Sequence, residues 1–143
     1  MNKWLLLVYK IPRKPTALRV SIWRKLKQLD ALLLHDSVWV LPATPQTREH
    51  FQWLASEIVE LGGEATVWVS ETALESQSAT LAKEFSTKTD SAYKEILTKL
   101  KRKNADRAAL ARQYQRVVAR DYSRSALGEK VRKALLAKGE NLP

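Results

Sequence analysis

Four arginines recur at intervals of four residues in the C-terminal half of the chain, at Arg112, Arg116, Arg120 and Arg124. On an α-helix each step of four residues turns by about 40°, so the four side chains would form a slanting stripe roughly 120° wide. Such a stripe can follow the phosphates of a DNA backbone, with Arg107 extending it. Few carboxylates interleave with these arginines, although a face that serves only solubility usually mixes charges. A solvated helix face remains the alternative.

A second basic cluster lies in "VYKIPRKPTALRVSIWRKL" (residues 8–26), directly after the most apolar run of the chain. Two prolines flank part of it and would hold the turn between them rigid, with its cations pointing outward. Farther along, Arg19 and Trp23 are four residues apart on a predicted helix, so we expect a cation–π contact between them. The cluster is predicted to bind phosphate or another anion, and a solubilising turn is the alternative. Its proposed contact residues are Lys10, Arg13, Lys14, Arg19 and Arg24.

Catalytic and metal-binding patterns are missing from the sequence. The two histidines, His35 and His50, lie on different predicted elements, without carboxylates at ligand spacing. The chain has no cysteine, and its four glycines form no phosphate-binding loop. Glu57, Glu60 and Glu64 fit a solvated helix face better than an acid cluster. We therefore expect neither an enzyme nor a cofactor or metal site.

The net charge of +10 is unevenly distributed. Residues 1–40 carry eight Lys/Arg against two Asp/Glu, residues 41–74 one against five, and residues 75–143 sixteen against eight. A strongly basic chain is typical of proteins that bind nucleic acid, an anionic surface or an acidic protein. The first apolar run is too short for a signal peptide, and no run approaches the ~20 residues that span a membrane, so we expect a soluble, cytoplasmic protein.

Apolar periodicity predicts an α+β fold for residues 1–74. Strands are expected at 3–11, 31–35, 38–41 and 64–70, the second and third joined by a turn at Asp36-Ser37. A helix capped by Thr16 follows the first strand, and a helix starting at Thr44-Pro45 follows the third. The order β-α-β-β-α-β predicts a ferredoxin-like domain, with two helices on one face of a four-stranded antiparallel sheet.

Residues 75–143 show only helical patterns and are predicted to form a basic helical extension, packed on or beside the first domain. The expected helices cover residues 78–86, 91–102, 106–122 and 125–138, with a break at "KRKN" (residues 101–104). Their apolar stripes must be buried against something, so a disordered tail is excluded.

The stretch "WLLLVYKIPRKPTALRVSIWRKLKQLDALLLHDSVWVLP" resembles the N-terminal domain of the ChrB family of chromate-resistance regulators. The resemblance continues through "TPQTREHFQWLASEIVELGGEA" and, more weakly, through "DSAYKEI" and "ARDYSRSALGEKVRKAL". The positions that carry it are Pro12, Arg13, Pro15, Arg19, Trp23, Arg24, Asp36, Trp39 and Pro42.

This resemblance implies a transcriptional regulator that binds double-stranded DNA and represses a chromate-resistance operon until chromate arrives. ChrB proteins carry a second, C-terminal domain that we do not find here, so chromate sensing by this chain alone is open.

The predicted core is also similar to Cas2-like domains, including those of PaaX-type repressors. In Cas2 nucleases an aspartate at the end of the first strand helps to hold a metal. Here Tyr9-Lys10-Ile11 has lysine instead, which repels a cation. Cas2-like relatives dimerise, so a homodimer is expected.

Three alternatives to a DNA-binding regulator remain. The basic helices could dock onto an acidic protein partner without any DNA. The region of Arg13, Arg19 and Arg24 could bind chromate or a similar oxyanion directly. A residual nuclease ranks last, because nothing in the sequence replaces the missing metal ligand.

Overall fold

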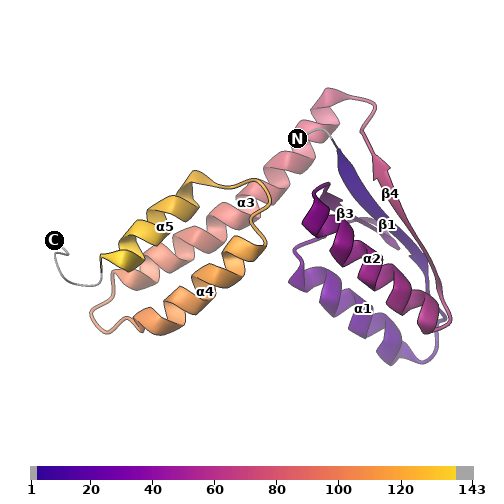
Figure 1. Ribbon diagram of the computed structural model, residues 1–143, viewed down its shortest axis with the longest axis horizontal. Helices are drawn as coiled ribbons and strands as arrows, with labels where there is room; N and C mark the ends of the chain where they lie inside the picture. Colours follow the sequence, from indigo (N-terminus) through magenta and orange to yellow (C-terminus); the bar gives the residue numbers. More distant parts are fainter. Residues whose placement is uncertain (1–2, 138–143) are drawn as a thin grey trace. The chain divides into compact units, whose positions relative to one another are not determined.

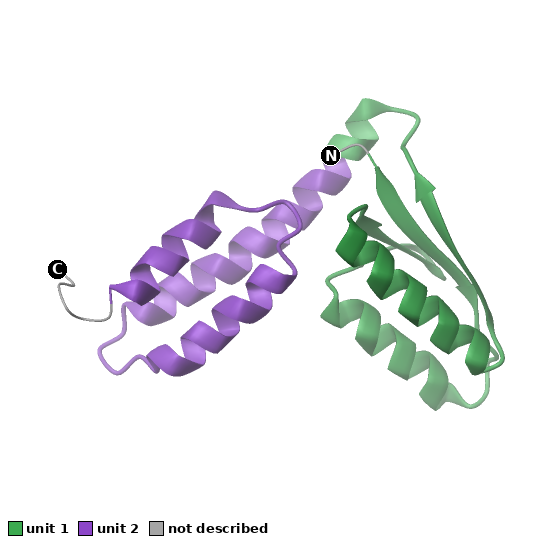
Figure 2. Cartoon of the chain, viewed as in Figure 1, with its two compact units in different colours: residues 1–79 green, residues 80–143 purple. Residues whose placement is uncertain are grey.

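A computed structural model describes residues 3–137 of the chain. The chain divides into two compact units, residues 1–79 and residues 80–143, which are coloured separately in Figure 2. The expected domain boundary at residues 74–75 falls at the start of helix α3 (Glu75–Leu100), which begins in the first unit and continues into the second.

The first unit contains a four-stranded antiparallel sheet, as the alternating sequence patterns predict. Its strands are β1 (Trp4–Lys10), β2 (Leu32–His35), β3 (Val38–Pro42) and β4 (Glu64–Ser70), in the spatial order β2-β3-β1-β4. Every neighbouring pair is antiparallel, and β1 lies in the middle between β3 and β4. The two short strands β2 and β3 form the expected hairpin, with an irregularity in register between Leu33 and His35.

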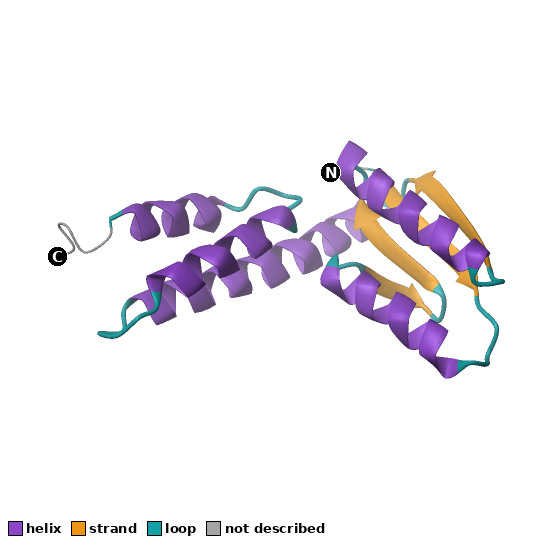
Figure 3. Cartoon of the chain, turned by 60° about the horizontal axis from the view of Figure 1, so that its bottom comes forward, coloured by secondary structure: helices purple, strands orange, loops and turns teal. Residues whose placement is uncertain are grey.

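Helices α1 (Thr16–Gln28) and α2 (Pro45–Glu60) lie on one face of this sheet (Figures 1 and 3). Large apolar side chains from both layers are fully buried, including Leu5 and Leu7 of β1, Ile22 of α1 and Phe51 of α2. On the opposite face of β1, the indole Nε1 of Trp4 donates a 3.1 Å hydrogen bond to Ser78 Oγ in the first turns of α3.

The starts of α1 and α2 differ from each other. Thr44 caps α2 as predicted: its hydroxyl accepts a hydrogen bond from the Thr47 amide, and Thr47 Oγ1 accepts one from the Thr44 amide. The prediction that Thr16 caps α1 is wrong. Thr16 is the first helical residue, and Pro15 occupies the cap position without a side-chain hydrogen bond. Proline has no hydroxyl to offer, so α1 begins without the usual cap.

Helices also build the second unit, which consists of α3 from Thr80 onward, α4 (Arg107–Ala119) and α5 (Ala126–Leu136). The break at residues 101–104 is present between α3 and α4. Asp106 and Ser125 cap α4 and α5, each accepting a hydrogen bond from a backbone amide of the first turn. The buried core joins all three helices and contains Tyr93, Ile96, Leu110, Val117 and Val131.

The prediction of two separate helices within residues 78–102 is wrong, because α3 runs unbroken for 26 residues. Residues 86–91 contain serines, threonines and an aspartate, and such side chains can compete for backbone hydrogen bonds. Here they bond to the preceding turn instead: Ser86 Oγ donates to the Lys83 carbonyl at 3.2 Å and Thr89 Oγ1 to the Phe85 carbonyl at 3.1 Å. Both bonds are compatible with a continuous helix.

A polar network joins α3 to the connection between α4 and α5. Tyr93 Oη donates to Asp121 Oδ2 at 2.9 Å, and the Asp121 carboxylate accepts the Ser125 amide. Ser125 Oγ in turn donates to Asp90. Burial and the neighbouring Asp121 carboxylate both raise the pKa of Tyr93 well above its usual value. Gly128 of α5 fits against the same tyrosine, since an added Cβ would lie 2.9 Å from Tyr93 Oη.

Candidate nucleic-acid interface

Almost all of the net positive charge belongs to the helical unit. Residues 80–143 carry sixteen Lys/Arg against seven Asp/Glu, whereas residues 1–79 carry nine against eight. Charge of one sign that accumulates on a small helical unit raises the local concentration of polyanions and speeds their association. The helical unit is therefore the first place to look for a nucleic-acid surface.

Only half of the predicted arginine stripe lies on a helix. Arg112 and Arg116 are exposed on α4, one turn apart, and neither guanidinium has a hydrogen-bond or ion-pair partner within residues 3–137. The helix ends at Ala119, so Arg120 is its C-terminal cap and turns its Nε back to the Arg116 carbonyl at 3.2 Å. Arg124 lies beyond the helix with a positive φ of 54°. The helix predicted for residues 106–122 thus ends three residues early, so Arg120 does not continue the stripe, while Arg124 already lay beyond the predicted helix.

Arg107 has a structural contact that its sequence position did not indicate. Its Nη2 donates to the carbonyls of Ala134 at 2.9 Å and Leu135 at 3.4 Å, in the last turn of α5. Its Nε is buried and has no hydrogen-bond partner in the part of the chain that the structure describes. The guanidinium thus ties the start of α4 to the end of α5, where a cation also opposes the negative end of the helix dipole.

Further exposed cations were not included in the sequence-based set. Lys101, Arg102 and Lys103 lie together in the connection between α3 and α4, and Lys130 and Lys133 are exposed on α5. The signal for the first three was present in the sequence, because no carboxylate lies among residues 96–105, whereas Glu129 lies beside the lysines of α5. The sequence "KRKN" was predicted only as a helix break, although its three cations could also contact phosphate.

The N-terminal basic cluster spreads over several parts of the first unit. Lys10 ends β1 and is paired in register with Glu64 of β4, while Arg13 and Lys14 lie in the exposed turn before α1. Arg19 lines a hollow between α1 and the β2–β3 hairpin, and Arg24 lines a different one on α1. The structure thus does not gather Arg13, Arg19 and Arg24 around a single anion.

The expected contact between Arg19 and Trp23 is replaced by another one. The ammonium group of Lys27 lies 5.7 Å from the centroid of a Trp23 ring, within cation–π range. Both cations are four residues from Trp23, one on each side, so the sequence spacing could not distinguish them. Arg19 is left without a partner among residues 3–137.

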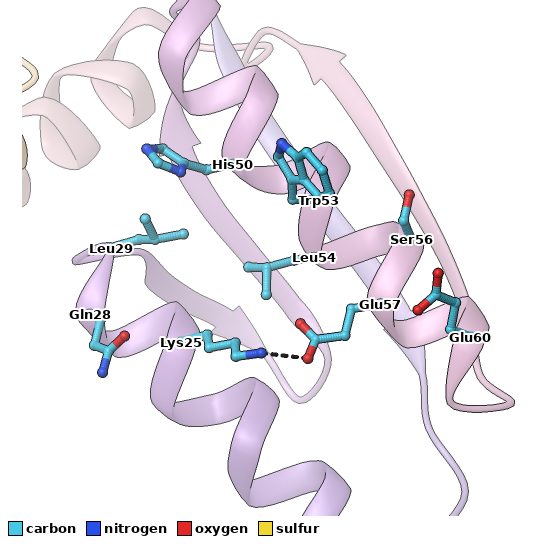
Figure 4. A pocket seen from close by; sticks show the side chains of 9 residues that line it. All are labelled: Lys25, Gln28, Leu29, His50, Trp53, Leu54, Ser56, Glu57 and Glu60. Atoms are coloured by element: carbon cyan, nitrogen blue, oxygen red, sulfur yellow. Dashed lines mark hydrogen bonds and ion pairs between the residues drawn. The ribbon is translucent and has the colours of Figure 1, made fainter.

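A groove of about 570 Å³ lies between α1 and α2 (Figure 4). Lys25 of α1 forms an ion pair with Glu57 of α2 across it, and Trp53 is 71% exposed at its side. His50 and Ser56 also line the groove, but no hydrogen bond joins them within the described residues. A histidine base must hydrogen-bond to a serine to activate it as a nucleophile, and His50 and Ser56 do not form this bond.

The described residues contain neither a metal-binding cluster nor a membrane-spanning helix. Within residues 3–137 there is no group of three or more histidine, aspartate or glutamate side chains placed to hold a metal ion. Over the same range, none of the helices combines the length and the apolar character that a membrane crossing requires.

Comparison with known proteins identifies the family. A family model described as the N-terminal part of protein ChrB matches residues 19–124, which is most of the chain. The chain belongs to the ChrB N-terminal family. It is 36% identical over 66 residues to protein ChrB of Cupriavidus metallidurans, an alignment that covers 46% of this chain and 20% of that protein. The aligned part thus spans about a fifth of this ChrB relative. No solved structure matches the chain.

The ChrB match begins on α1 and ends after α4, so it includes parts of both units. The positions that carry the resemblance to ChrB are not spread evenly over this region. Arg19, Trp23, Asp36 and Trp39 all line the hollow between α1 and the β2–β3 hairpin. The residues that carry the resemblance thus gather at this hollow in the sheet-containing unit, while the net positive charge is concentrated in the helical unit.

Proposed function

We propose that this chain is a DNA-binding transcriptional regulator of the ChrB type that represses genes of chromate resistance. The proposed contacts run from the phosphates of double-stranded DNA to the helical unit, chiefly to Arg112 and Arg116 of α4, together with Arg120 and Arg124 after it. Arg13, Lys14, Arg19, Arg24 and Lys10 of the first unit are proposed as secondary contacts. Arg107 is left out, because its guanidinium holds α5.

One observation carries this proposal: nine of the ten excess positive charges belong to residues 80–143, where Arg112 and Arg116 of α4 are exposed. Among residues 3–137, Arg112 and Arg116 have no carboxylate partner that would compete with a phosphate. Membership of the ChrB family agrees with a regulator of chromate resistance. In this account the chain binds no cofactor or metal, catalyses no reaction and acts in the cytoplasm.

We further propose that the first unit is a ferredoxin-like domain of the Cas2-like kind and that the chain acts as a homodimer. The element order β1-α1-β2-β3-α2-β4 and the strand order β2-β3-β1-β4 support the fold assignment. A homodimer would match a two-fold symmetric operator, which regulators often read. A mass of 16.3 kDa by light scattering at working concentration would contradict the dimer.

The proposal is tested by fluorescence anisotropy with a labelled duplex taken from upstream of the gene and with a scrambled duplex of equal length. We expect tighter binding to the native duplex at both of two salt concentrations. Release on addition of chromate, but not of sulfate, would show that this chain senses chromate by itself. Equal and salt-labile binding to both duplexes would mean that the DNA responds only to the net charge.

A second candidate is an interaction module that binds an acidic protein instead of DNA. The exposed indole of Trp53 beside the groove of Figure 4 favours a protein contact, since exposed tryptophans are enriched at interface hot spots. Weak, sequence-blind DNA binding that disappears near physiological salt would favour this candidate over the regulator.

A further inference from the structure

A hollow of about 340 Å³ lies between α1 and the β2–β3 hairpin of the first unit. Apolar side chains from α1 and from the edge strand β2 contribute to it, among them Val20 and Leu33. Its volume lies at the lower end of the range for small-molecule sites in proteins. Neither the family match nor the charge distribution assigns it a role.

Three aromatic side chains line the hollow, and their positions are constrained. Trp39 is buried, and its indole Nε1 donates a 3.2 Å hydrogen bond to the hydroxyl of Tyr9. Trp23 is about half exposed, with the Lys27 ammonium group over its ring. The half-exposed ring of Trp23, held in this way, can stack on a planar ligand at little cost in side-chain entropy.

Polar groups of the hollow are left with unused hydrogen-bonding capacity. Within residues 3–137 neither the Arg19 guanidinium nor the Asp36 carboxylate has a hydrogen-bond or ion-pair partner. The Tyr9 hydroxyl accepts from Trp39, and its own proton has no acceptor in the same part of the chain. The hollow thus offers a fork of N–H donors, one O–H donor and one anionic acceptor beside aromatic walls.

We propose that this hollow binds a small planar organic anion, an aromatic ring that carries a carboxylate and an N–H or O–H donor. The carboxylate pairs with the guanidinium of Arg19, the ring stacks against the half-exposed Trp23 beside the buried Trp39, and the donor reaches Asp36. This site goes beyond the proposed DNA binding and requires no DNA.

An inorganic dianion fits the same hollow poorly. Among the lining residues that the structure describes, Arg19 is the only lysine or arginine, and Asp36 adds a negative charge to the same hollow. A compact dianion such as chromate would therefore meet one cation, one repelling carboxylate and aromatic rings whose faces carry no positive charge to bind it. A planar monoanion uses every kind of group that the hollow presents.

The test uses indole-3-carboxylate as the probe and the full chain labelled with ¹⁵N, in which each of the five tryptophans gives one indole N–H peak. We expect the probe to shift the peaks of Trp23 and Trp39 and to leave those of Trp53 and Trp68 in place. Indole-3-carboxamide, which lacks the charge, should bind about tenfold more weakly, since a charge-assisted hydrogen bond is lost.

Two matched variants test whether the carboxylate of the probe binds to Arg19. Arg19→Gln should weaken binding of indole-3-carboxylate about tenfold and leave binding of the carboxamide unchanged. Arg24→Gln removes the same charge from the same helix, but outside this hollow, and should change neither. Equal effects of the two variants would overturn the proposal. So would peak shifts at Trp53 and Trp68 as large as those at Trp23 and Trp39, no shift at millimolar probe, or tighter binding of chromate than of the probe.

Discussion

Replacing Arg107 by alanine should destabilise the helical unit without weakening DNA binding by the folded protein. The side chain donates two hydrogen bonds to carbonyls in the last turn of α5, at 2.9 and 3.4 Å. A hydrogen bond from a charged donor contributes about 1.5–3 kcal/mol, and a cation at a helix C-terminus adds about 0.3–1 kcal/mol. The second bond is long, the side chain is half-buried and its Nε is unsatisfied, so we expect a net loss of about 2 kcal/mol in the free energy of unfolding.

Thermal unfolding followed by circular dichroism measures this loss. For a unit of this size 1 kcal/mol corresponds to about 4–8 °C, so Tm of the helical transition should fall by roughly 8–16 °C. Arg107→Lys should lie in between, because one ammonium group keeps the charge but not the fork of donors. Arg112→Ala is the matched control on the same helix and should leave Tm nearly unchanged. An unchanged Tm for Arg107→Ala, or equal losses for both alanine variants, would refute the structural role of Arg107.

Three further predictions concern the buried polar contacts and the small residues beside them. Gly128→Ala should cost about 1–3 kcal/mol in urea unfolding, because the new Cβ would lie 2.9 Å from Tyr93 Oη; an unchanged midpoint would mean that the tyrosine moves at no cost. The raised pKa of Tyr93 means that the folded protein holds this proton more tightly than the unfolded chain does. Stability from this site should thus be complete below pH 10 and decline above it, and Tyr93→Phe should remove that part of the decline. Trp4→Phe should cost about 1–3 kcal/mol in the same unfolding assay, through loss of the bond to Ser78 and the space left by the smaller ring; a loss below 0.5 kcal/mol would contradict the packing of this face.

Local signals in the sequence predicted most of the first unit. The Thr44-Pro45 start of α2 and the alternation in β4 each have a short-range physical cause, and both appear in the structure. The capping of α1 by Thr16 failed for a local reason too, since Pro15 takes the cap position. Sequence patterns within about ten residues were thus sufficient to predict the helices and strands of the first unit, and the errors concern only where these elements begin and end.

Long-range contacts account for what the sequence could not predict. The break expected inside α3 does not occur, and in that stretch Asp90 accepts a hydrogen bond from Ser125, 35 residues farther along the chain. Arg107 looked like part of a basic surface, but its partners lie 27 and 28 residues away. The hollow with Arg19 and Asp36 is assembled from four separate segments, and no spacing in the sequence indicates that they meet.

The most direct test of the proposed DNA surface is the salt dependence of binding to the native duplex. Arg112→Ala/Arg116→Ala removes two exposed charges of α4, and Lys3→Ala/Arg48→Ala removes two exposed charges of the first unit as a matched control. Each lost phosphate contact lowers the slope of log K against log salt by about 0.9. The slope should therefore fall by about 1.8 for the first pair and stay unchanged for the control. Equal slopes for the two double variants would contradict the assignment of the DNA-binding surface to α4.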